Sequence, residues 1–140
     1  MITTHSTEET YAYAKKISET LKPGDIITLQ GDLGSGKTTF TQGLGKALGI
    51  TRPITSPTFL FIKSYSIEKG VIKKLYHVDL YRIEKEEDIK GLGLMEMLSD
   101  SEAITVIEWP EKMGSLLPQR RIALEFEYVD ENTRRIEVRS

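Results

Sequence analysis

The sequence predicts an α/β fold in which a parallel sheet forms the core and antiparallel strands or hairpins extend it. A short apolar run at residues 26–29 is followed by a glycine-rich turn and an amphipathic helical pattern. A second apolar run, residues 104–107, also reads as a buried strand. A strictly alternating segment near the end of the chain predicts an antiparallel hairpin with one solvated face. Helices and apolar strands in this order are typical of α/β proteins.

The composition is that of one ordinary globular domain, expected to span residues 1–140. The net charge of −2 argues against a protein held to nucleic acid mainly by its own basic surface. There is no cysteine, which excludes disulfides, thiolate zinc sites and cysteine nucleophiles. Neither a secretory signal nor an apolar run near the ~18 residues of a membrane span is recognisable, so we expect a cytoplasmic location.

The first predicted helix begins with a capping box, in which Ser6 caps the helix and Glu9 follows three residues later. Apolar side chains then recur at helical spacing, at Tyr11, Ala14, Ile17 and Leu21. Residues 23–24, Pro-Gly, end this helix. After the strand at 26–29 and its glycine-rich turn, a second helix places one apolar face at Phe40, Leu44, Ala47 and Leu48. Gly49 is a plausible stop for it.

The middle of the chain predicts a β-hairpin. Residues 58–67 look extended, with one side formed by Phe59, Phe61, Tyr65 and Ile67. A turn at 68–70 leads into a second extended segment, 71–82. Two short helices are expected at 84–90 and 94–99.

The strand at residues 104–107 leads directly into Glu108. Near the end of the chain, residues 122–128 alternate apolar and polar side chains. A turn at 130–132 connects them to a partner strand at 134–139.

Residues 31–38 match the pattern G-x-x-x-x-G-K-[ST] at every fixed position, with a strand before and a helix after it. This pattern is the P-loop, so the fold expected is P-loop NTPase-like. Glycines let backbone N–H groups point at anionic phosphate, and the helix N-terminus adds positive potential. We predict that the nucleotide phosphates contact Gly34, Ser35, Gly36, Lys37, Thr38 and Thr39. Lys37 would reach the β- and γ-phosphates, and the Thr38 hydroxyl would ligate Mg²⁺.

Two acids at the ends of predicted strands are candidates for the Mg²⁺ side of such a site. Glu108 follows an apolar strand and is favoured, whereas Asp79 follows a more polar run within the predicted hairpin. Asp79 would then position or activate water. For either acid, a solvated charge at a strand end is the plain alternative.

The γ-phosphate side could involve residues 55–58, including Thr58, because nucleotide-sensing loops often follow the P-loop helix. An ordinary loop is the equal alternative. Arg52 and Arg82 are candidates for a stabilising arginine, although neither is evident as one, so slow hydrolysis by the isolated protein is expected. The sequence does not assign the residues that contact the adenine base. Residues 6–8 and the last hairpin are two candidates.

Four blocks together resemble the bacterial TsaE (YjeE) family: G-D-L-G-S-G-K-T-T at 31–39, S-P-T-F at 56–59, H-V-D-L-Y-R at 77–82 and E-W-P at 108–110. The resemblance implies an ATPase required for threonylcarbamoyladenosine (t6A) at position 37 of tRNA. It implies ATP and Mg²⁺ as cofactors and the TsaB–TsaD pair as partners. Contact with tRNA would be indirect, through that complex.

By the same resemblance, residues 34–39 hold the phosphates, and Thr38 and Glu108 hold Mg²⁺. Asp79, with Lys37, is implied in catalysis. Trp109 matches a family position on the γ-phosphate side, although it could also be an ordinary core aromatic.

Three other functions remain open. A small-molecule kinase would use the same P-loop but needs an acceptor site and usually an arginine-rich lid, whereas the arginine pairs at 120–121 and 134–135 flank or enter strands. A regulatory GTPase is disfavoured because the only asparagine, Asn132, cannot form an N-K-x-D motif. The third is a binding module that carries a nucleotide and acts by docking alone, without hydrolysis.

Overall fold

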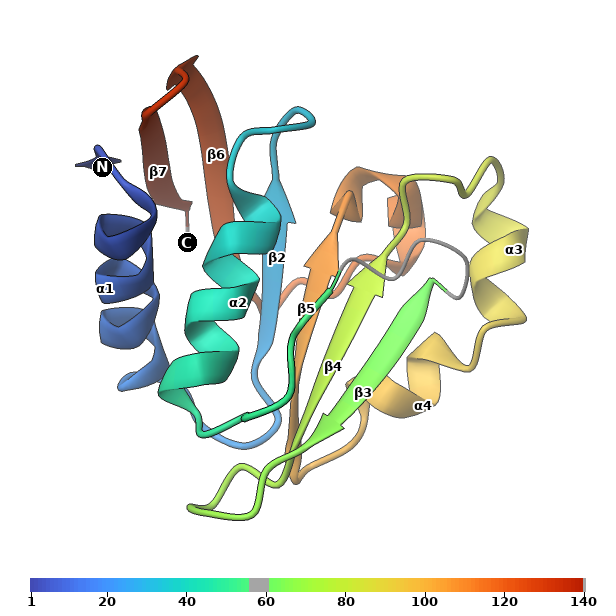
Figure 1. Cartoon of the computed structure of the whole chain (residues 1–140). Helices are drawn as coiled ribbons and strands as arrows, with labels where there is room; N and C mark the ends of the chain where they lie inside the picture. Colours follow the sequence, from blue (N-terminus) through green and yellow to red (C-terminus); the bar gives the residue numbers. More distant parts are fainter. Residues whose placement is uncertain (56–60, 140) are drawn as a thin grey trace.

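The computed structural model describes residues 1–55 and 61–139, and in this part of the chain seven strands form one mixed sheet (Figure 1). The strands are β1 (Ile2–Thr4), β2 (Ile26–Gln30), β3 (Ile62–Ser66), β4 (Lys74–Asp79), β5 (Ala103–Glu108), β6 (Ile122–Asp130) and β7 (Thr133–Arg139). The α-helices are α1 (Thr7–Ser18), α2 (Lys37–Ala47), α3 (Glu86–Lys90) and α4 (Leu94–Leu98). A 3₁₀ segment, η1, covers Pro110–Leu116.

The sheet order is β1-β7-β6-β2-β5-β4-β3. The four central strands, β6, β2, β5 and β4, run parallel to one another, while β7 and β3 pair antiparallel with β6 and β4, and β1 pairs antiparallel with β7. The α/β prediction, with a parallel core extended by antiparallel strands, is therefore confirmed. Both predicted hairpins, β3–β4 and β6–β7, are present.

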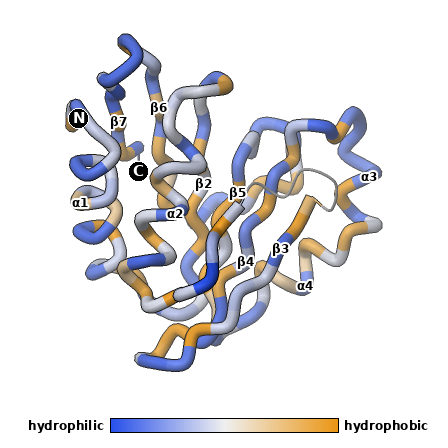
Figure 2. The backbone as a smooth tube through the Cα atoms, viewed as in Figure 1, coloured by the Kyte–Doolittle hydropathy of each residue, from blue (hydrophilic) through white to orange (hydrophobic). Residues whose placement is uncertain are grey.

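Two apolar clusters cover the two faces of the sheet. Val106 and Ile107 are neighbours on β5 and therefore point to opposite faces. Val106 belongs to the cluster that includes Phe40 and Leu44 of α2, and Ile107 belongs to the cluster formed with α3, α4 and η1. Along the backbone, apolar residues (orange) alternate with hydrophilic ones (blue) in the strands and the helices alike (Figure 2).

The start of α1 has the predicted capping box, except that the Glu9 carboxylate bonds to a different backbone N–H. The Ser6 hydroxyl accepts a hydrogen bond from the Glu9 backbone N–H at 3.1 Å. The Glu9 carboxylate accepts from the backbone N–H of His5, one residue before the cap. Both bonds satisfy backbone donors around the first turn, which an uncapped helix would leave to water.

The structure differs from the sequence prediction at the β3–β4 hairpin. Of the expected extended segment at 58–67, the described residues form a strand over Ile62–Ser66, and Phe61 just before it has a left-handed backbone with φ of 57°. Phe59 lies outside the described residues. The extended segment expected at 71–82 is a strand only over Lys74–Asp79. More importantly, β4 pairs with β5 as well as with β3, so it belongs to the parallel core.

Two elements were not predicted: the short strand β1 and the 3₁₀ segment η1. The short helices lie close to their expected positions, at Glu86–Lys90 and Leu94–Leu98. None of the helices described here has both the length and the apolar character that a bilayer span requires.

Candidate functional site

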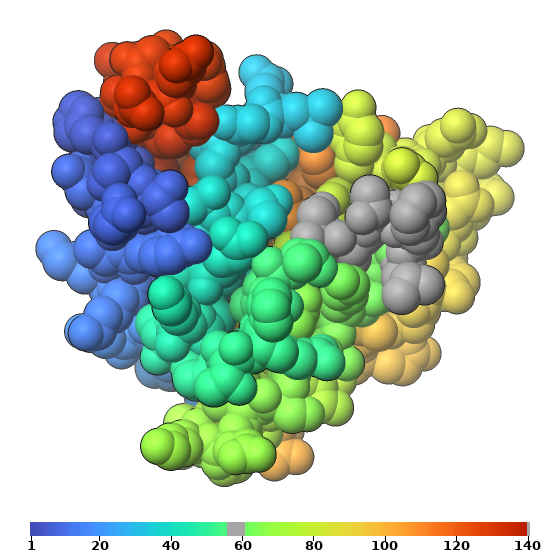
Figure 3. Space-filling view, viewed as in Figure 1, coloured from blue at the N-terminus to red at the C-terminus, as the bar shows by residue number. Residues whose placement is uncertain are grey.

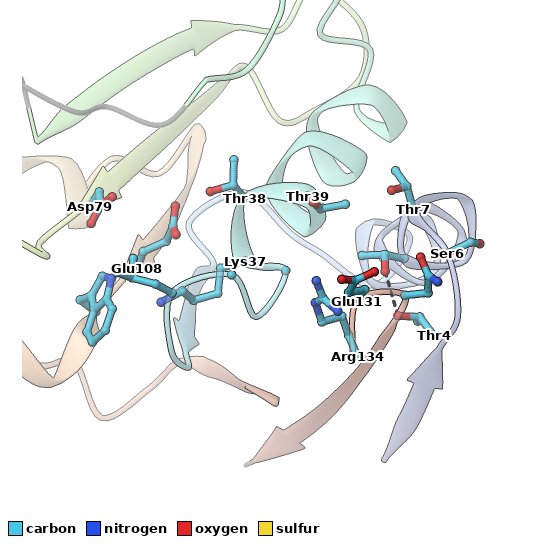
Figure 4. Close-up of a pocket in the computed structure, with 16 residues that line it drawn as sticks. Thr4, Ser6, Thr7, Lys37, Thr38, Thr39, Asp79, Glu108, Glu131 and Arg134 are labelled. Atoms are coloured by element: carbon cyan, nitrogen blue, oxygen red, sulfur yellow. Dashed lines mark hydrogen bonds between the residues drawn. The ribbon is translucent and has the colours of Figure 1, made fainter. Parts of the chain in front are cut away.

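A cavity of about 380 Å³ lies at the edge of the sheet where the parallel strands β2, β5 and β4 end. Four parts of the chain line it (Figure 4): the β2–α2 loop with the start of α2, the ends of β4 and β5, the segment from β1 into α1, and the β6–β7 turn. In the space-filling view, the β2–α2 loop (cyan) lies at the surface close to the β6–β7 turn (red) (Figure 3). The carboxyl edge of parallel strands is where α/β proteins generally bind ligands.

The β2–α2 loop brings backbone N–H groups to this cavity. Gly34 and Gly36 have φ of 78° and 101°, conformations that glycine adopts without the strain another residue would carry. Gly36 is the N-cap of α2, and no side chain caps this helix, in contrast to Ser6 at α1. The N-cap of α2 therefore leaves the first N–H groups of the helix uncapped, next to the cavity-lining Lys37, Thr38 and Thr39. The N-terminal end of α2, which carries the positive end of the helix dipole, lies at the cavity and favours negative charge there.

Lys37 is a buried cation at the same place, with only 4% of its surface exposed. Its ammonium donates to the Gly31 carbonyl and lies 4.0 Å from the centroid of the Trp109 ring. Burial lowers the pKa of Lys37, while the nearby carboxylates of Glu108 and Asp79 act in the opposite direction. A desolvated ammonium is stabilised by any anion that enters the cavity.

The structure brings both candidate acids to the cavity. Asp79 and Glu108 are direct neighbours in the parallel pairing of β4 with β5. Glu108 is buried and bonded to His77, with 2.5 Å between the Nε2 and Oε2 atoms. Asp79 is half-buried, and its carboxylate accepts the backbone N–H of Tyr81 at 3.0 Å. Figure 4 shows Glu108 between Asp79 and Lys37, at one end of the cavity.

Apart from Trp109, the remaining predicted site residues divide into three groups. Gly34, Gly36, Thr38 and Thr39 line the cavity. Ser35 is fully buried, and its hydroxyl has no hydrogen-bond partner among the described residues. Thr58 lies outside the described residues.

Trp109 lines the cavity and also packs against the apolar cluster on the α3 face. Its backbone is left-handed, with φ of 60°, and its ring lies 5.0 Å from the Tyr81 ring, centroid to centroid. The side chain therefore serves both as a partly buried packing group and as a wall beside the Lys37 ammonium. The packing against the apolar cluster agrees with the core-aromatic alternative, while a place on the γ-phosphate side stays a prediction.

Neither arginine suggested by the sequence is among the residues that line the cavity. Arg52 instead donates to the Ser64 carbonyl at 2.6 Å and lies 4.6 Å from the Tyr65 ring centroid. Arg134, which enters the sequence predictions only as half of an arginine pair at 134–135, lines the cavity. Its aliphatic part packs near Gly36, so that a Cβ added there would lie 3.5 Å from the Arg134 Cγ.

The far end of the cavity is rich in hydroxyl groups and turn residues. Thr4, Ser6, Thr7 and Thr10 line it from the start of the chain, and Glu131 and Asn132 of the β6–β7 turn and Arg134 at the start of β7 line it from the other side. The hydroxyls of Thr4 and Thr10 are hydrogen-bonded at 2.9 Å. Residues 6–8 and the last hairpin are the two candidate segments for contacts with the base. Residues of both segments lie at this end of the cavity (Figure 4).

The oxygen donors at the Lys37 end suit Mg²⁺ only in combination with a phosphate ligand. Within the described residues, no group of three or more His, Cys, Asp or Glu side chains is placed to hold a metal ion. Thr38, Asp79 and Glu108 nevertheless offer hard oxygen donors around one cavity. Mg²⁺ is commonly bound by one or two carboxylates plus substrate phosphates rather than by an all-protein cage.

The fold places this chain among the α/β proteins that have a cavity at the carboxyl edge of their parallel strands. A glycine-rich loop and the N-terminus of a helix line this cavity. The chain belongs to the TsaE family. The family model "Threonylcarbamoyl adenosine biosynthesis protein TsaE" matches residues 4–136, so the family indicated by the sequence blocks is confirmed.

Individual relatives agree with this assignment. The tRNA threonylcarbamoyladenosine biosynthesis protein TsaE of Bacillus subtilis is 44% identical over 92% of this chain and 78% of its own length. The protein of the same name from a Nostoc species is 46% identical over 87% of this chain and 74% of its own length. A solved structure, "Crystal structure of Bacillus subtilus YdiB", superposes with a TM-score of 0.79 at 37% identity, covering 98% of this chain and 82% of that one.

Proposed function

We propose that this protein binds Mg²⁺-ATP in the cavity and hydrolyses it in the cytoplasm, in support of t6A formation at position 37 of tRNA. The observation that carries the proposal is the buried Lys37 at the start of α2, with the carboxylates of Glu108 and Asp79 at the same cavity. Membership of the TsaE family supplies the tRNA context.

The phosphates fit the Lys37 end of the cavity. Backbone N–H groups of residues 34–39 would surround the β- and γ-phosphates, and the Lys37 ammonium would move from the Gly31 carbonyl to phosphate oxygens. A volume of about 380 Å³ is within the range of small-molecule sites. Trp109 lies beside Lys37 and would therefore face the γ-phosphate side. Thr58 remains a sequence prediction for that side.

Thr38 and Glu108 are the residues that would hold Mg²⁺, since both present oxygen atoms near the phosphate end. When bound, the ion neutralises charge on the phosphates. Asp79 lies in register beside Glu108 and is held by the Tyr81 N–H rather than by His77. Its carboxylate would position the attacking water and accept a hydrogen bond from it.

The nucleoside would occupy the opposite end. Because residues 34–39 fix the phosphates beside Lys37, the ribose and base extend toward the hydroxyl-rich end of the cavity. Thr4, Thr7, Glu131 and Asn132 offer hydroxyl, carboxylate and amide groups there. Such groups read the polar edges of a sugar or base by hydrogen bonds.

The partner is the TsaB–TsaD pair, and contact with tRNA is made through that complex rather than by the net-negative surface of this chain. We expect immobilised TsaB–TsaD to retain the protein more strongly with ATP than without, and tRNA alone to retain little. Hydrolysis by the isolated protein should be slow, since a stabilising arginine supplied by a partner can raise such rates by ~10³–10⁵. Pull-down and phosphate release, measured with and without the pair, check both expectations. Equal retention with and without ATP, together with an unchanged rate, would reject the partnership.

A further inference from the structure

We propose that His77 is a positioning residue: its imidazole fixes the orientation of the Glu108 carboxylate so that one oxygen of that group is presented to the metal. The inference rests on the proposed function, because it assigns a purpose to a residue behind the proposed Mg²⁺ ligand. His77 itself does not line the cavity.

The sheet places these two side chains together. His77 lies on β4 two residues before Asp79, and Asp79 pairs with Glu108 of β5. Residues two apart on a strand share a face, so His77, Asp79 and Glu108 all point toward the face covered by α2. His77 is fully buried and Glu108 is 3% exposed. The Nε2 and Oε2 atoms, 2.5 Å apart, are in direct hydrogen-bond contact.

The second imidazole nitrogen identifies which atom donates. The Nδ1 atom of His77 is buried and has no hydrogen-bond partner among the described residues. A proton there would leave a buried N–H without an acceptor, at a substantial desolvation cost. The carboxylate can only accept, so the proton of this bond belongs to Nε2, and the Nε2–H group donates to Glu108.

This bond uses one of the two carboxylate oxygens. With Oε2 held by His77, the Oε1 atom remains for a ligand in the cavity that Thr38 and Lys37 also line. A free glutamate side chain samples many rotamers, whereas this one is fixed before any ligand enters. Hydrogen-bond partners of ligating carboxylates typically contribute 10–100-fold to metal affinity or activity. His77 therefore tunes the affinity for Mg²⁺ without contacting the ion.

The test is a Mg²⁺ titration of the ATP-bound protein, followed by the fluorescence of Trp109, which is the only tryptophan. In His77→Leu, the Mg²⁺ concentration at half-saturation should rise about 10–100-fold. The affinity for ATP without Mg²⁺ should stay within about 2-fold. His77→Gln should recover most of the loss, because its amide nitrogen can take the place of Nε2. His77→Asn, whose amide is too short, should behave like His77→Leu and serves if that variant does not fold.

A matched control comes from the same strand. Tyr76→Phe removes a hydrogen bond to Asp100 away from the cavity and should leave the Mg²⁺ dependence unchanged. In a Glu108→Ala background, His77→Leu should add no further shift, since its target is gone. A wild-type Mg²⁺ dependence in folded His77→Leu or His77→Asn, or an additive shift in the double variant, would overturn the inference alone. Failure of the unsubstituted protein to bind ATP would overturn the proposed function and the inference with it.

Discussion

Replacing Lys37 with alanine should lower the affinity for ATP by about 100-fold or more. Removing one partner of a buried, hydrogen-bonded charge pair commonly costs about 2–5 kcal/mol, and ~1.4 kcal/mol corresponds to tenfold in affinity. The Lys37 ammonium is buried at the start of α2, so bulk water screens its attraction for phosphate only weakly. Isothermal titration calorimetry with ATP measures the change directly.

Lys46→Ala is the matched control for this variant. Lys46 lies in the last turn of the same helix, and its ammonium is 5.5 Å from the Tyr11 ring centroid, outside the cavity at Lys37. We expect its affinity for ATP to equal that of the unsubstituted protein. If Lys37→Ala bound ATP as tightly as Lys46→Ala, Lys37 would not be the phosphate-binding residue.

Replacing Asp79 with asparagine should slow ATP hydrolysis about 10²–10⁴-fold while changing the affinity for ATP only a few-fold. A positioned general base typically contributes that factor to the rate. Asparagine keeps the shape and the acceptor for the Tyr81 N–H, so the β4 end should remain intact. Single-turnover hydrolysis in the presence of TsaB–TsaD, compared with equilibrium binding, separates the two effects.

Asp100→Asn provides the comparison for Asp79→Asn. Asp100 accepts a hydrogen bond from Tyr76 of β4, and it does not line the cavity. Its hydrolysis rate should be that of the unsubstituted protein. Unchanged hydrolysis in Asp79→Asn would remove the water-positioning role and leave Asp79 as a structural strand-end charge.

Local patterns made the core of the fold predictable. The apolar run at 26–29, the turn glycines and the apolar spacing after Lys37 each reflect rules that act over a few residues, and the strand and helix appear where those rules put them. The Ser6 cap is equally local, because its partner is three residues away. Such signals do not depend on how strands assemble.

The long-range pairings could not be predicted in the same way. By sequence, Glu108 is favoured over Asp79, which follows a more polar run in a predicted hairpin, yet β4 also pairs with β5 and brings both acids together. Arg134 and Thr4 reach the cavity only because β6 pairs with β2 and β1 pairs with β7. No local pattern specifies these neighbours, since any apolar strand can pair with several others. The left-handed backbone of Phe61 likewise contradicts the local preference of an aromatic residue.

The central claim is that the cavity binds Mg²⁺-ATP through its triphosphate. Calorimetric titration of the unsubstituted protein with ATP, GTP and AMP, each with and without Mg²⁺, tests it most directly. We expect ATP to bind more tightly than GTP, Mg²⁺ to strengthen its binding, and AMP to bind at least ~100-fold more weakly, because AMP lacks the phosphates that Lys37 would contact. Equal affinity for ATP and AMP, tighter binding of GTP, or no binding of ATP would contradict the account.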